Sequence, residues 1–500
     1  MINFLKKNIA KIWAKNHVAK TEDFKNNAEV LQEKLLLDLV KKSEKTLFGL
    51  QHNFSEIKSV EDFQKNVKIS DYEDLKPFVE KVKHGDKNIL WPEKPEYFAK
   101  TSGTTSGTKY IPLTKEGMDY QVKAAQSALF HYIAQKNNAD FVNGKMIFLQ
   151  GSPELEDIND IKTGRLSGIV AHHIPKYLQK NRLPSYETNC IEDWETKVDK
   201  IVEETEKENM TLISGIPPWL IMYFEKLIER NGKKIKQLFP NLQLIVTGGV
   251  NYEPYREKME ELLGGKVDII QTFPASEGFF AFQDKKEKEG LLLQSNHGIF
   301  YEFIPLELYG KPDAPRLTLK EVELNKDYAL ILTTNSGLWA YSIGDVVRFI
   351  SKNPHRILVS GRTKHFTSAF GEHVIAFEVE EAMKATVEKF PAQITEFHLA
   401  PQVNPENGEL PYHEWFIEFE KEPENLEDFR QNLDAEMRKR NTYYDDLIAG
   451  NILQVLKITK LQKNAFQEYA KSEGKLGGQN KIPRLANDRK IGDFLKNFKI

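Results

Sequence analysis

The most unusual segment of the sequence is a loop rich in hydroxyl side chains and glycine. Residues 101–108 read Thr-Ser-Gly-Thr-Thr-Ser-Gly-Thr, and Lys109 follows. Glycines let backbone N–H groups approach a phosphate closely, and the lysine adds a cation. A P-loop has four residues between its glycines and a lysine directly after the second, so this segment is not one. It predicts a different phosphate-binding loop, with a solvated Ser/Thr loop or a phosphorylation site as the alternative.

Two further segments carry groups that suit the other parts of a nucleotide. Residues 273–277 place an aromatic ring, a hydroxyl and a carboxylate close together, which could stack a base, contact phosphate and hold Mg²⁺. Asp345 follows Gly344, where it could form an Asx-turn or bind a ribose diol. Each segment alone is weak evidence. Their order along the chain with Arg362 and a lysine near the C-terminus favours a nucleotide site.

Short apolar runs that resemble buried strands would position these segments. The runs are residues 145–149, 210–214, 242–247 and 267–272. A helical pattern over residues 254–263 joins the last two runs into a βαβ unit, which is typical of a parallel sheet. Ligands bind beyond the carboxyl ends of parallel strands, so the loops at 215–219, 248–249 and 273–277 could share one pocket. The loop at 215–219 is either a structural turn or a wall of an acyl pocket.

Beyond Gly361 the pattern changes to that of a smaller domain. Strands and helices are predicted in the order β-α-β-β-α-β, at residues 366–370, 377–390, 394–403, 414–420, 426–437 and 452–458. The predicted fold class is α/β, with mostly parallel sheets and flanking helices in a large N-terminal domain. A smaller C-terminal α+β domain follows after a hinge. We place the domains at residues 1–361 and 362–500.

In this order the segments resemble the motifs of the adenylate-forming superfamily, which includes acyl-CoA synthetases, luciferases and the adenylation domains of peptide synthetases. The likeness is greatest to the auxin-responsive family of plant acyl acid–amido synthetases and their bacterial relatives. The matching motifs are the phosphate loop at 101–109, an adenine-pocket turn at 248–249, an aromatic-to-Glu motif at 273–277, a Tyr-x-x-Gly-Asp-Val motif at 341–346 and a Gly-Gly…Lys-x-Pro-Arg tail at 477–484.

The resemblance implies an ATP-dependent ligase that works in two half-reactions. A carboxylate attacks the α-phosphate of ATP, pyrophosphate leaves, and a nucleophile then displaces AMP from the acyl adenylate. In the amido-synthetase branch this nucleophile is an amine, usually that of an amino acid. The implied cofactors are ATP and Mg²⁺, because negative charge that gathers at one phosphorus needs cations and oriented N–H donors.

Residue roles carry over to this chain through the matching motifs. Phe273 would stack the adenine, Asp345 would hold the ribose hydroxyls, and Arg362 would lie near the ribose at the hinge. Glu277 would support Mg²⁺, and Lys481 would bridge the carboxylate and the α-phosphate from the small domain. The remaining nucleotide contacts implied by the resemblance are Ser102, Gly103, Thr104, Thr105, Gly248, Gly249 and Ser276.

Three positions depart from the usual motifs of the superfamily. Ser342 stands where an arginine is usual, Phe273 replaces a tyrosine, and Thr363 and Lys364 occupy the hinge where many members have Asp or Lys. None of these changes removes a group that adenylation requires. An acyl-CoA ligase of the same superfamily and a non-catalytic nucleotide-binding protein are the alternatives. Only the tail motif favours an amine over coenzyme A as acceptor.

The composition excludes several classes of protein. Five hundred residues suggest two or three folding units, and 70 Lys+Arg against 73 Asp+Glu leave a net charge of −3, which argues against nucleic-acid binding by bulk charge. The single Cys190 excludes an intrachain disulfide, and His172–His173 lack a third metal ligand at a recognisable spacing. No apolar run reaches the ~20 residues of a membrane helix, so we expect a cytoplasmic protein.

The first twenty residues are predicted to form an amphipathic helix rather than a signal peptide, because lysines interrupt every apolar run. Ile2, Leu5, Ile9 and Ile12 recur at helical spacing, opposite the lysines. We expect this apolar face to pack on the protein itself, and no membrane partner. A helix on a membrane surface is the alternative.

Overall fold

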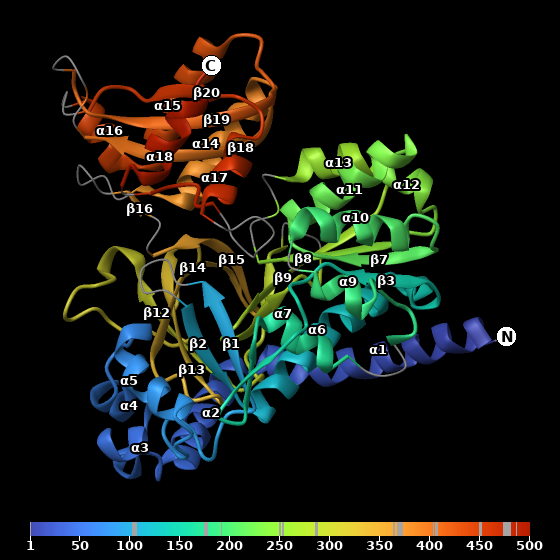
Figure 1. Ribbon diagram of the computed structural model, residues 1–500. Coiled ribbons are helices and arrows are strands. Elements are labelled where there is room, and N and C mark those ends of the chain that lie inside the picture. Colours follow the sequence, from blue (N-terminus) through green and yellow to red (C-terminus); the bar gives the residue numbers. More distant parts are fainter. Residues whose placement is uncertain are drawn as a thin grey trace. The chain divides into compact units, whose positions relative to one another are not determined.

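The computed structural model divides into two compact units, each described below by itself (Figure 1). Unit 1 comprises Met1–Tyr252 and Glu260–Val359, and unit 2 comprises Glu253–Met259 and Ser360–Ile500. The structure describes residues 2–102, 108–174, 179–191, 193–249, 252, 255–285, 289–363, 366–367, 374–403, 405, 409–449, 453–473, 482–486 and 488–500. The substrate-binding and catalytic roles predicted for the two domains stay predictions.

An 11-stranded mixed sheet forms the centre of unit 1. Its strands are β3 (Lys145–Phe148), β6 (Arg182–Leu183), β7 (Met210–Ser214), β8 (Leu244–Gly248), β9 (Asp268–Ala275), β10 (Gly278–Phe282), β11 (Leu291–Leu293), β12 (Ile299–Pro305), β13 (Asp327–Thr334), β14 (Tyr341–Lys352) and β15 (His355–Arg362). Their order is β12-β13-β14-β15-β11-β10-β9-β8-β7-β3-β6. The run from β6 to β9 pairs in parallel, whereas β9–β10, β10–β11, β11–β15, β12–β13 and β13–β14 are antiparallel. The prediction of mostly parallel sheets was therefore wrong for this second part, where neighbouring strands such as β9 and β10 are joined by a tight turn.

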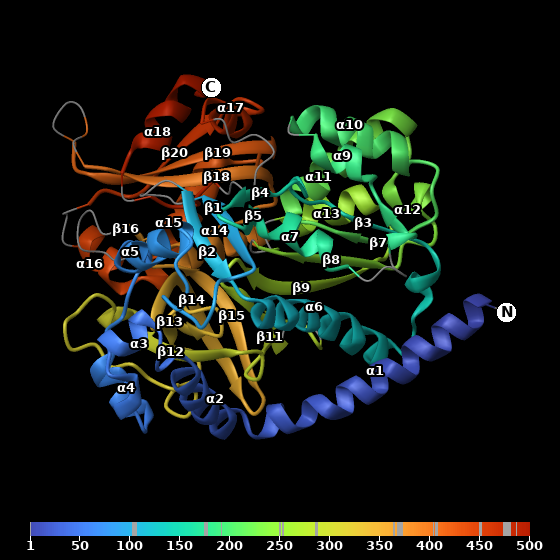
Figure 2. The same cartoon turned by 60° about the horizontal axis from the view of Figure 1, so that its bottom comes forward.

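The parallel part of the sheet follows the predicted βαβ pattern. Strands β3, β7, β8 and β9 correspond to the four apolar runs, and α13 (Arg256–Leu263) lies between β8 and β9 in the chain. Figures 1 and 2 show α10 (Trp194–Thr205) and α11 (Pro217–Asn231) over one face, with α1 (Ile2–Asn26) and α6 (Lys115–Lys136) along the other. Helices on both faces explain why these strands carry consecutive apolar residues rather than a strict alternation of apolar and polar ones.

A second, four-stranded sheet of unit 1 carries the hydroxyl-rich loop. Its order is β2 (Thr108–Leu113), β1 (Tyr97–Ser102), β5 (Ile161–Gly164) and β4 (Glu156–Ile158). β1 and β2 are antiparallel, with Ser102 opposite Thr108, so the loop joins the two strands of a hairpin. The remaining helices of unit 1 are α2 (Ala28–Ser43), α3 (Leu47–Gln51), α4 (Val60–Asn66), α5 (Tyr72–Lys83), α7 (Leu166–His172), α9 (Tyr186–Cys190) and α12 (Ile235–Leu238).

Helix α1 contacts α6 through a face other than the predicted one. Ala14 is fully buried, and the ring Nε2 of His17 lies 2.6 Å from the Ser127 hydroxyl on α6. By contrast, Ile9 and Ile12 are 39% and 57% exposed. The prediction that the isoleucine face packs on the protein was wrong, because the small side chain of Ala14 permits the closer approach between the helices.

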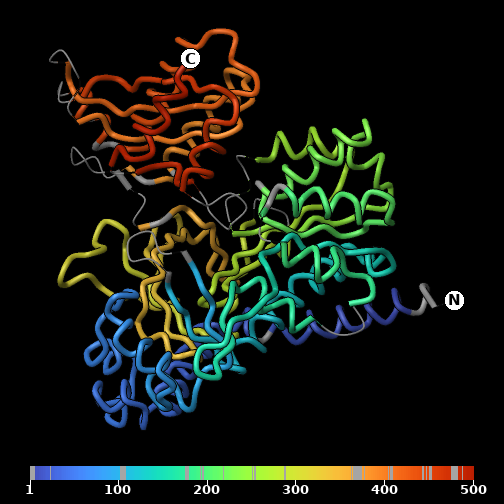
Figure 3. Tube along the Cα trace, viewed as in Figure 1, coloured from blue at the N-terminus to red at the C-terminus, as the bar shows by residue number. Residues whose placement is uncertain are grey.

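Unit 2 is built on a three-stranded sheet with helices on both faces. Strands β18 (Gln393–Gln402) and β19 (Tyr412–Lys421) are antiparallel, and β20 (Lys457–Leu461) is parallel to β19. The helices are α14 (Ala376–Lys389), α15 (Leu426–Arg440), α16 (Thr442–Ala449), α17 (Ala465–Ser472) and α18 (Lys490–Leu495), and a short pair of strands is formed by β16 (Phe366–Thr367) and β17 (Val374–Ile375). The Cα trace in Figure 3 shows these orange and red segments gathered together.

The last predicted strand of unit 2 was misplaced. It was expected at residues 452–458, whereas β20 begins at Lys457 and α16 precedes it. Leu453 and Leu456 are only 1% and 0% exposed, so they supply the apolar signal from an irregular segment that packs into the core. Core packing without strand pairing thus produced the wrong boundary.

Candidate active site

The carboxyl ends of β8 and β9 bring two of the predicted segments side by side. Gly248 pairs with Thr272 in the parallel register, which places the turn at Gly248 and Gly249 next to Phe273. A Cβ at position 248 would lie 2.5 Å from the carbonyl oxygen of Thr272, and Gly249 has a φ of +77°. The close carbonyl at position 248 and the positive φ at position 249 both favour glycine, so the backbone of this turn carries no side chain of its own.

Ser276 and Glu277 form the two-residue turn between β9 and β10. Gly278 pairs with Ala275 directly after the turn, and a Cβ at Gly278 would overlap Ile299. The tight hairpin therefore fixes the backbone of Glu277 at the strand end. A carboxylate is a ligand of the type that Mg²⁺ takes, and the metal-binding role of Glu277 stays a prediction.

Phe273 is more enclosed than its predicted role requires. Its side chain is 7% exposed and belongs to the main core of unit 1. The ring packs edge-on against Phe280, with centroids 5.0 Å apart and planes at 71°. Stacking on adenine stays a prediction, and little of the ring face is open to a ligand in this arrangement.

Asp345 lies in a bulge within β14. On β13, Ala329 and Ile331 pair with Val346 and Ser342, so three residues of β14 stand opposite one residue of β13. Gly344 supports the bulge with a φ of +85°. Bulges re-aim side chains near functional sites, and Asp345 is half-buried.

Ser342, which replaces the usual arginine, serves packing. It is 8% exposed, and its hydroxyl lies 2.7 Å from that of Tyr309. Its backbone N–H donates to the carbonyl of Ser70 at 2.8 Å. A position held this tightly has no room for a guanidinium, which accounts for the departure from the motif.

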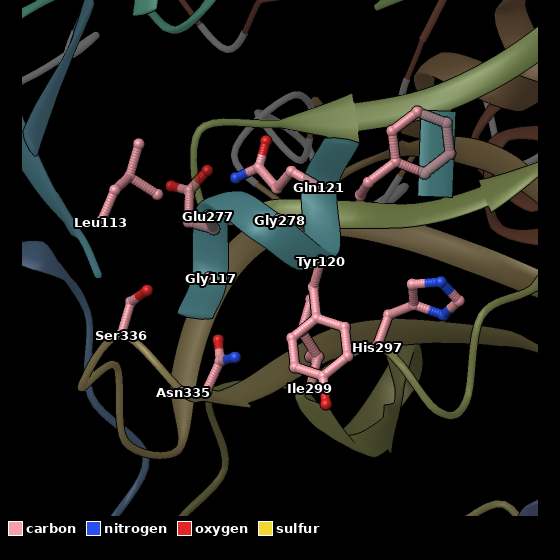
Figure 4. Close-up of a pocket in the computed structure, with 11 residues that line it drawn as sticks. Leu113, Gly117, Tyr120, Gln121, Glu277, Gly278, His297, Ile299, Asn335 and Ser336 are labelled. Atoms are coloured by element: carbon pink, nitrogen blue, oxygen red, sulfur yellow. The ribbon is translucent and has the colours of Figure 1, made fainter. Parts of the chain in front are cut away.

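A small pocket of unit 1 adjoins Glu277 (Figure 4). The residues that line it are Leu113, Gly117, Tyr120, Gln121, Glu277, Gly278, Phe279, His297, Ile299, Asn335 and Ser336. They come from the end of β2, the first turns of α6, the β9–β10 turn, the start of β12 and the loop after β13. The amide of Gln121 donates to the carbonyl of Ser276 at 3.5 Å, which connects α6 to the turn. The room inside is about that of one water molecule.

Two of the residues that line the pocket each have a buried polar atom with no hydrogen-bond partner among the described residues. These atoms are Nδ1 of His297 and the amide nitrogen of Asn335. Burial, with a smaller contribution from His17 and Lys123, lowers the pKa of His297 to about 4, so the ring is neutral at pH 7. The ring lies T-shaped against Tyr120, with centroids 5.9 Å apart. Buried polar groups normally have partners, so these two atoms are suited to a polar ligand or to water.

Sequence reasoning did not single out the pocket residues Gln121, His297 and Asn335. One signal was available, because residues 333–336 form a polar run that begins in the last two residues of the buried strand β13 and continues into the loop after it. Gly215 and Trp219, the candidate pocket wall, do not line this pocket, and Trp219 is 4% exposed within the core.

Several predicted site residues lie outside the described residues. These are Gly103, Thr104, Thr105 and Lys481. Ser102 and Arg362 are described by their backbone alone, at the ends of β1 and β15. Lys109, next to the loop, has its ammonium 5.5 Å from the centre of the Tyr72 ring. The predicted roles of all these residues stay predictions.

The residues that follow Lys481 are attached to the edge of β18 in unit 2. The N–H of Leu399 donates to the carbonyl of Arg484 at 2.8 Å, and the N–H of Ala486 donates to the carbonyl of Leu399 at 3.0 Å. The guanidinium of Arg484 forms an ion pair with Glu396, and the two side chains are 10% and 16% exposed. Backbone and side-chain contacts thus fix the chain just beyond the predicted catalytic lysine.

The adjacent histidines act separately. Nε2 of His172 lies 2.8 Å from the carbonyl of Pro153, and Nε2 of His173 lies 3.1 Å from the hydroxyl of Tyr97. Within the described part of the chain, no three His, Cys, Asp or Glu side chains are grouped to hold a metal ion. No described helix is both long and apolar enough to cross a membrane.

Comparison with known proteins defines first a class and then a family. The structure of the acyl acid amido synthetase AtGH3.15 in complex with 2,4-DB matches 97% of this chain and 96% of its own, with a TM-score of 0.80 at 17% identity. A 2-hydroxyisobutyryl-CoA ligase in the postadenylation state matches 93% of this chain and 90% of its own, with a TM-score of 0.61 at 12% identity. The fold is that of ligases that form acyl adenylates.

The sequence comparisons are more specific. Models of the GH3 family match this chain with the N-terminal domain at residues 17–181 and 159–269, the central domain at 292–362 and the C-terminal domain at 377–490. A probable indole-3-acetic acid-amido synthetase of Arabidopsis thaliana, GH3.1, is 22% identical over 95% of this chain and 92% of its own. The jasmonoyl–L-amino acid synthetase JAR4 of Nicotiana attenuata is 24% identical over 57% of this chain and 60% of its own. The chain belongs to the GH3 family of acyl acid–amido synthetases, ligases that use ATP.

Proposed function

We propose that this protein activates a carboxylic acid as an acyl adenylate and transfers the acyl group to the amine of an amino acid, releasing AMP and pyrophosphate. The observation that carries the proposal is the juxtaposition of the Gly248–Gly249 turn with Phe273 at adjacent strand ends, one turn before Glu277, in a chain of the GH3 family. Carboxyl ends of parallel strands are where nucleotides bind in α/β folds.

The described residues suit the first half-reaction. Asp345 would accept hydrogen bonds from the ribose hydroxyls, and Glu277 would hold Mg²⁺, which neutralises charge on the phosphates. Lys481 would bring a second cation to the α-phosphate and the attacking carboxylate. The attachment of residues 482–486 to β18 supports this role, because it restricts where the preceding residue can reach.

The pocket beside Glu277 is our candidate site for the acid. It adjoins the carboxylate that would hold Mg²⁺, and the unpaired atoms of His297 and Asn335 could bind polar groups of the acid. Its present size is too small for an acid, so we expect Tyr120 to change its rotamer on binding. Because His297 is neutral at pH 7, this pocket would bind the acid without a histidinium counter-charge.

A matrix of carboxylic acids and amines tests the proposal. The full chain with ATP and Mg²⁺ is incubated with each pair, and AMP, pyrophosphate and the amide are measured, with coenzyme A as a competing acceptor. We expect amide formation with at least one acid and amino acid. Thioester formation without amide would make the protein an acyl-CoA ligase, and nucleotide binding without acid-dependent pyrophosphate release would make it a binding protein.

A separate variant tests the role proposed for Lys481. Lys481→Ala should abolish acid-dependent pyrophosphate exchange while ATP still binds, because it removes the cation that joins the two reacting groups. Lys463→Ala is the matched control, since the Lys463 side chain is 65% exposed in the same unit. Normal exchange in Lys481→Ala would refute the assignment.

A further inference from the structure

One face of α1 exposes a cluster of large apolar side chains. Ile9, Ile12 and Trp13 are 39%, 57% and 55% exposed, and their spacing of three and four residues places them on the same side of the helix. No other described helix exposes more than one large apolar side chain. Single exposed apolar residues are ordinary, but a contiguous patch marks an interaction surface.

The opposite face of α1 already has its partners. Ala14 is buried against the core of unit 1, His17 contacts Ser127, and the hydroxyl of Thr21 lies 3.2 Å from Nε2 of His131. Lys7 forms an ion pair with Asp140. Figures 1 and 2 show α1 lying along α6 with its other side open. The helix is therefore held in place with its apolar cluster facing outward.

Basic residues surround this cluster. The helix contains six lysines and two acidic residues, a net charge of +4, in a chain whose total is −3. No acidic residue precedes Glu22, and Lys6, Lys15 and Lys20 are exposed. The exposed face therefore combines aliphatic side chains and a tryptophan with uncompensated positive charge.

We propose that the face of α1 formed by Ile9, Ile12 and Trp13 binds the surface of a bilayer that contains anionic lipids. The apolar side chains enter the boundary between headgroups and acyl chains, where tryptophan is favoured. The flanking lysines contact lipid phosphates. A purely apolar protein partner would leave the lysines without contacts. A purely acidic partner would leave the exposed side chains of Trp13 and Ile12 without contacts. The protein associates with the surface through this helix and does not cross the membrane.

Vesicle binding by the full chain tests the proposal. Co-sedimentation is measured with vesicles of phosphatidylglycerol and phosphatidylcholine and with vesicles of phosphatidylcholine alone. We expect binding to the anionic vesicles to be at least about tenfold tighter and to weaken as salt is added. The fluorescence of Trp13 should shift to the blue on binding, and Trp13→Phe should lose that part of the shift.

Two double variants separate the apolar contribution to vesicle binding from the electrostatic one. Ile12→Asp with Trp13→Asp should reduce binding at least about tenfold, and Lys6→Glu with Lys15→Glu should remove the preference for anionic lipid. Leu50→Asp is the matched control, because Leu50 is 66% exposed on α3 and should leave binding unchanged. Circular dichroism and thermal unfolding verify that each variant is folded.

Three outcomes would overturn the proposal. The first is absence of binding to anionic vesicles at low salt, and the second is unchanged binding when Ile12 and Trp13 are both replaced. The third is a dimer in sedimentation analysis that Ile12→Asp dissociates, which would make the face an interface between two copies of the chain.

Discussion

The setting of Asp345 makes the sharpest prediction for a single residue. Asp345 lies in the bulge of β14, and hydrogen bonds to a charged group contribute ~1.5–3 kcal/mol each. We expect Asp345→Ala to weaken ATP and AMP binding by one to a few factors of about ten, with the fold intact. Titration calorimetry measures the change.

The control for this prediction is a carboxylate in the same unit that the site does not involve. Asp313 is exposed in the loop between β12 and β13, so Asp313→Ala should bind both nucleotides normally. If Asp345→Ala also binds them normally, the ribose role of Asp345 is rejected.

The burial of His131 leads to a prediction of how the free energy of unfolding depends on pH. Burial lowers its pKa from the ordinary 6.5 to about 4, while its Nδ1–H donates to the carbonyl of Ser127 at 2.9 Å. The folded protein therefore keeps His131 neutral where the unfolded chain takes up a proton. This contribution to stability is complete above about pH 6.5 and is lost as the pH falls toward about 4. The expected slope for one such proton is about 1.4 kcal/mol per pH unit.

Thermal unfolding from pH 7 to pH 4 measures this effect. His131→Gln should make the unfolding temperature of unit 1 less dependent on pH, whereas His84→Gln, at an exposed position, should not. His297 contributes with the same sign, so a smaller slope should persist in His131→Gln. An unchanged slope in His131→Gln would contradict the prediction.

At the scale of elements, the edge of β18 binds the segment that follows Lys481 and so fixes its position. Glu396→Gln would remove the carboxylate that forms an ion pair with the largely buried Arg484, and breaking a buried ion pair typically costs ~3–5 kcal/mol. We expect unit 2 to unfold at a lower temperature and acid-dependent pyrophosphate exchange to slow. Glu420→Gln is the control, since Glu420 lies at an exposed end of β19 and pairs with Lys463 at 3.2 Å. Equal unfolding temperatures in the two variants would refute this view of the ion pair.

The sequence predicted elements best where burial on both faces makes an apolar run continuous. Strands β7, β8 and β9 were found for this reason, and their order predicted where Gly248 and Phe273 meet. The antiparallel part was missed although β10 and β13 carry equally apolar runs, because an apolar run does not show the direction in which a strand pairs. Leu453 and Leu456 led to a wrong strand boundary, because buried leucines in an irregular segment give the same apolar pattern in the sequence as a strand does.

The site was predictable only in part, for a related reason. Glu277 and Asp345 belong to motifs of contiguous residues, which a sequence displays directly. Gln121, His297 and Asn335 come from three separate elements and reach one pocket only through the fold. No local pattern marks such a set. Likewise, no local pattern in α1 shows that Ala14, and not Ile12, packs against the core.

For the whole molecule, the division into two units supports a prediction about motion. If Lys481 serves adenylation from the small domain, it must later leave room for an acceptor, and we therefore expect rotation about a hinge. Lys364→Pro fixes φ near −65° and removes a backbone donor. We expect it to spare one half-reaction and to slow the other at least about tenfold, which is about 1.4 kcal/mol of barrier.

Single-turnover kinetics separate the two steps. Adenylate formation is measured first, and transfer from preformed adenylate to the amine is measured second. A rigid enzyme would show the same effect of Lys364→Pro on both steps, or none. Equal slowing in a folded variant would argue against this pivot.

The contact between Leu485 and Leu399 has a consequence for chain length. Leu485 is four positions after Lys481, with three residues between them, and four positions along the chain span at most about 14 Å, so the lysine is on a short tether. Deleting one residue from 482–484 would shorten the tether by about 3.5 Å, more than the tolerance of a hydrogen bond. The number of residues between this anchor and the lysine is therefore constrained independently of their chemistry, and a redesigned enzyme should keep it.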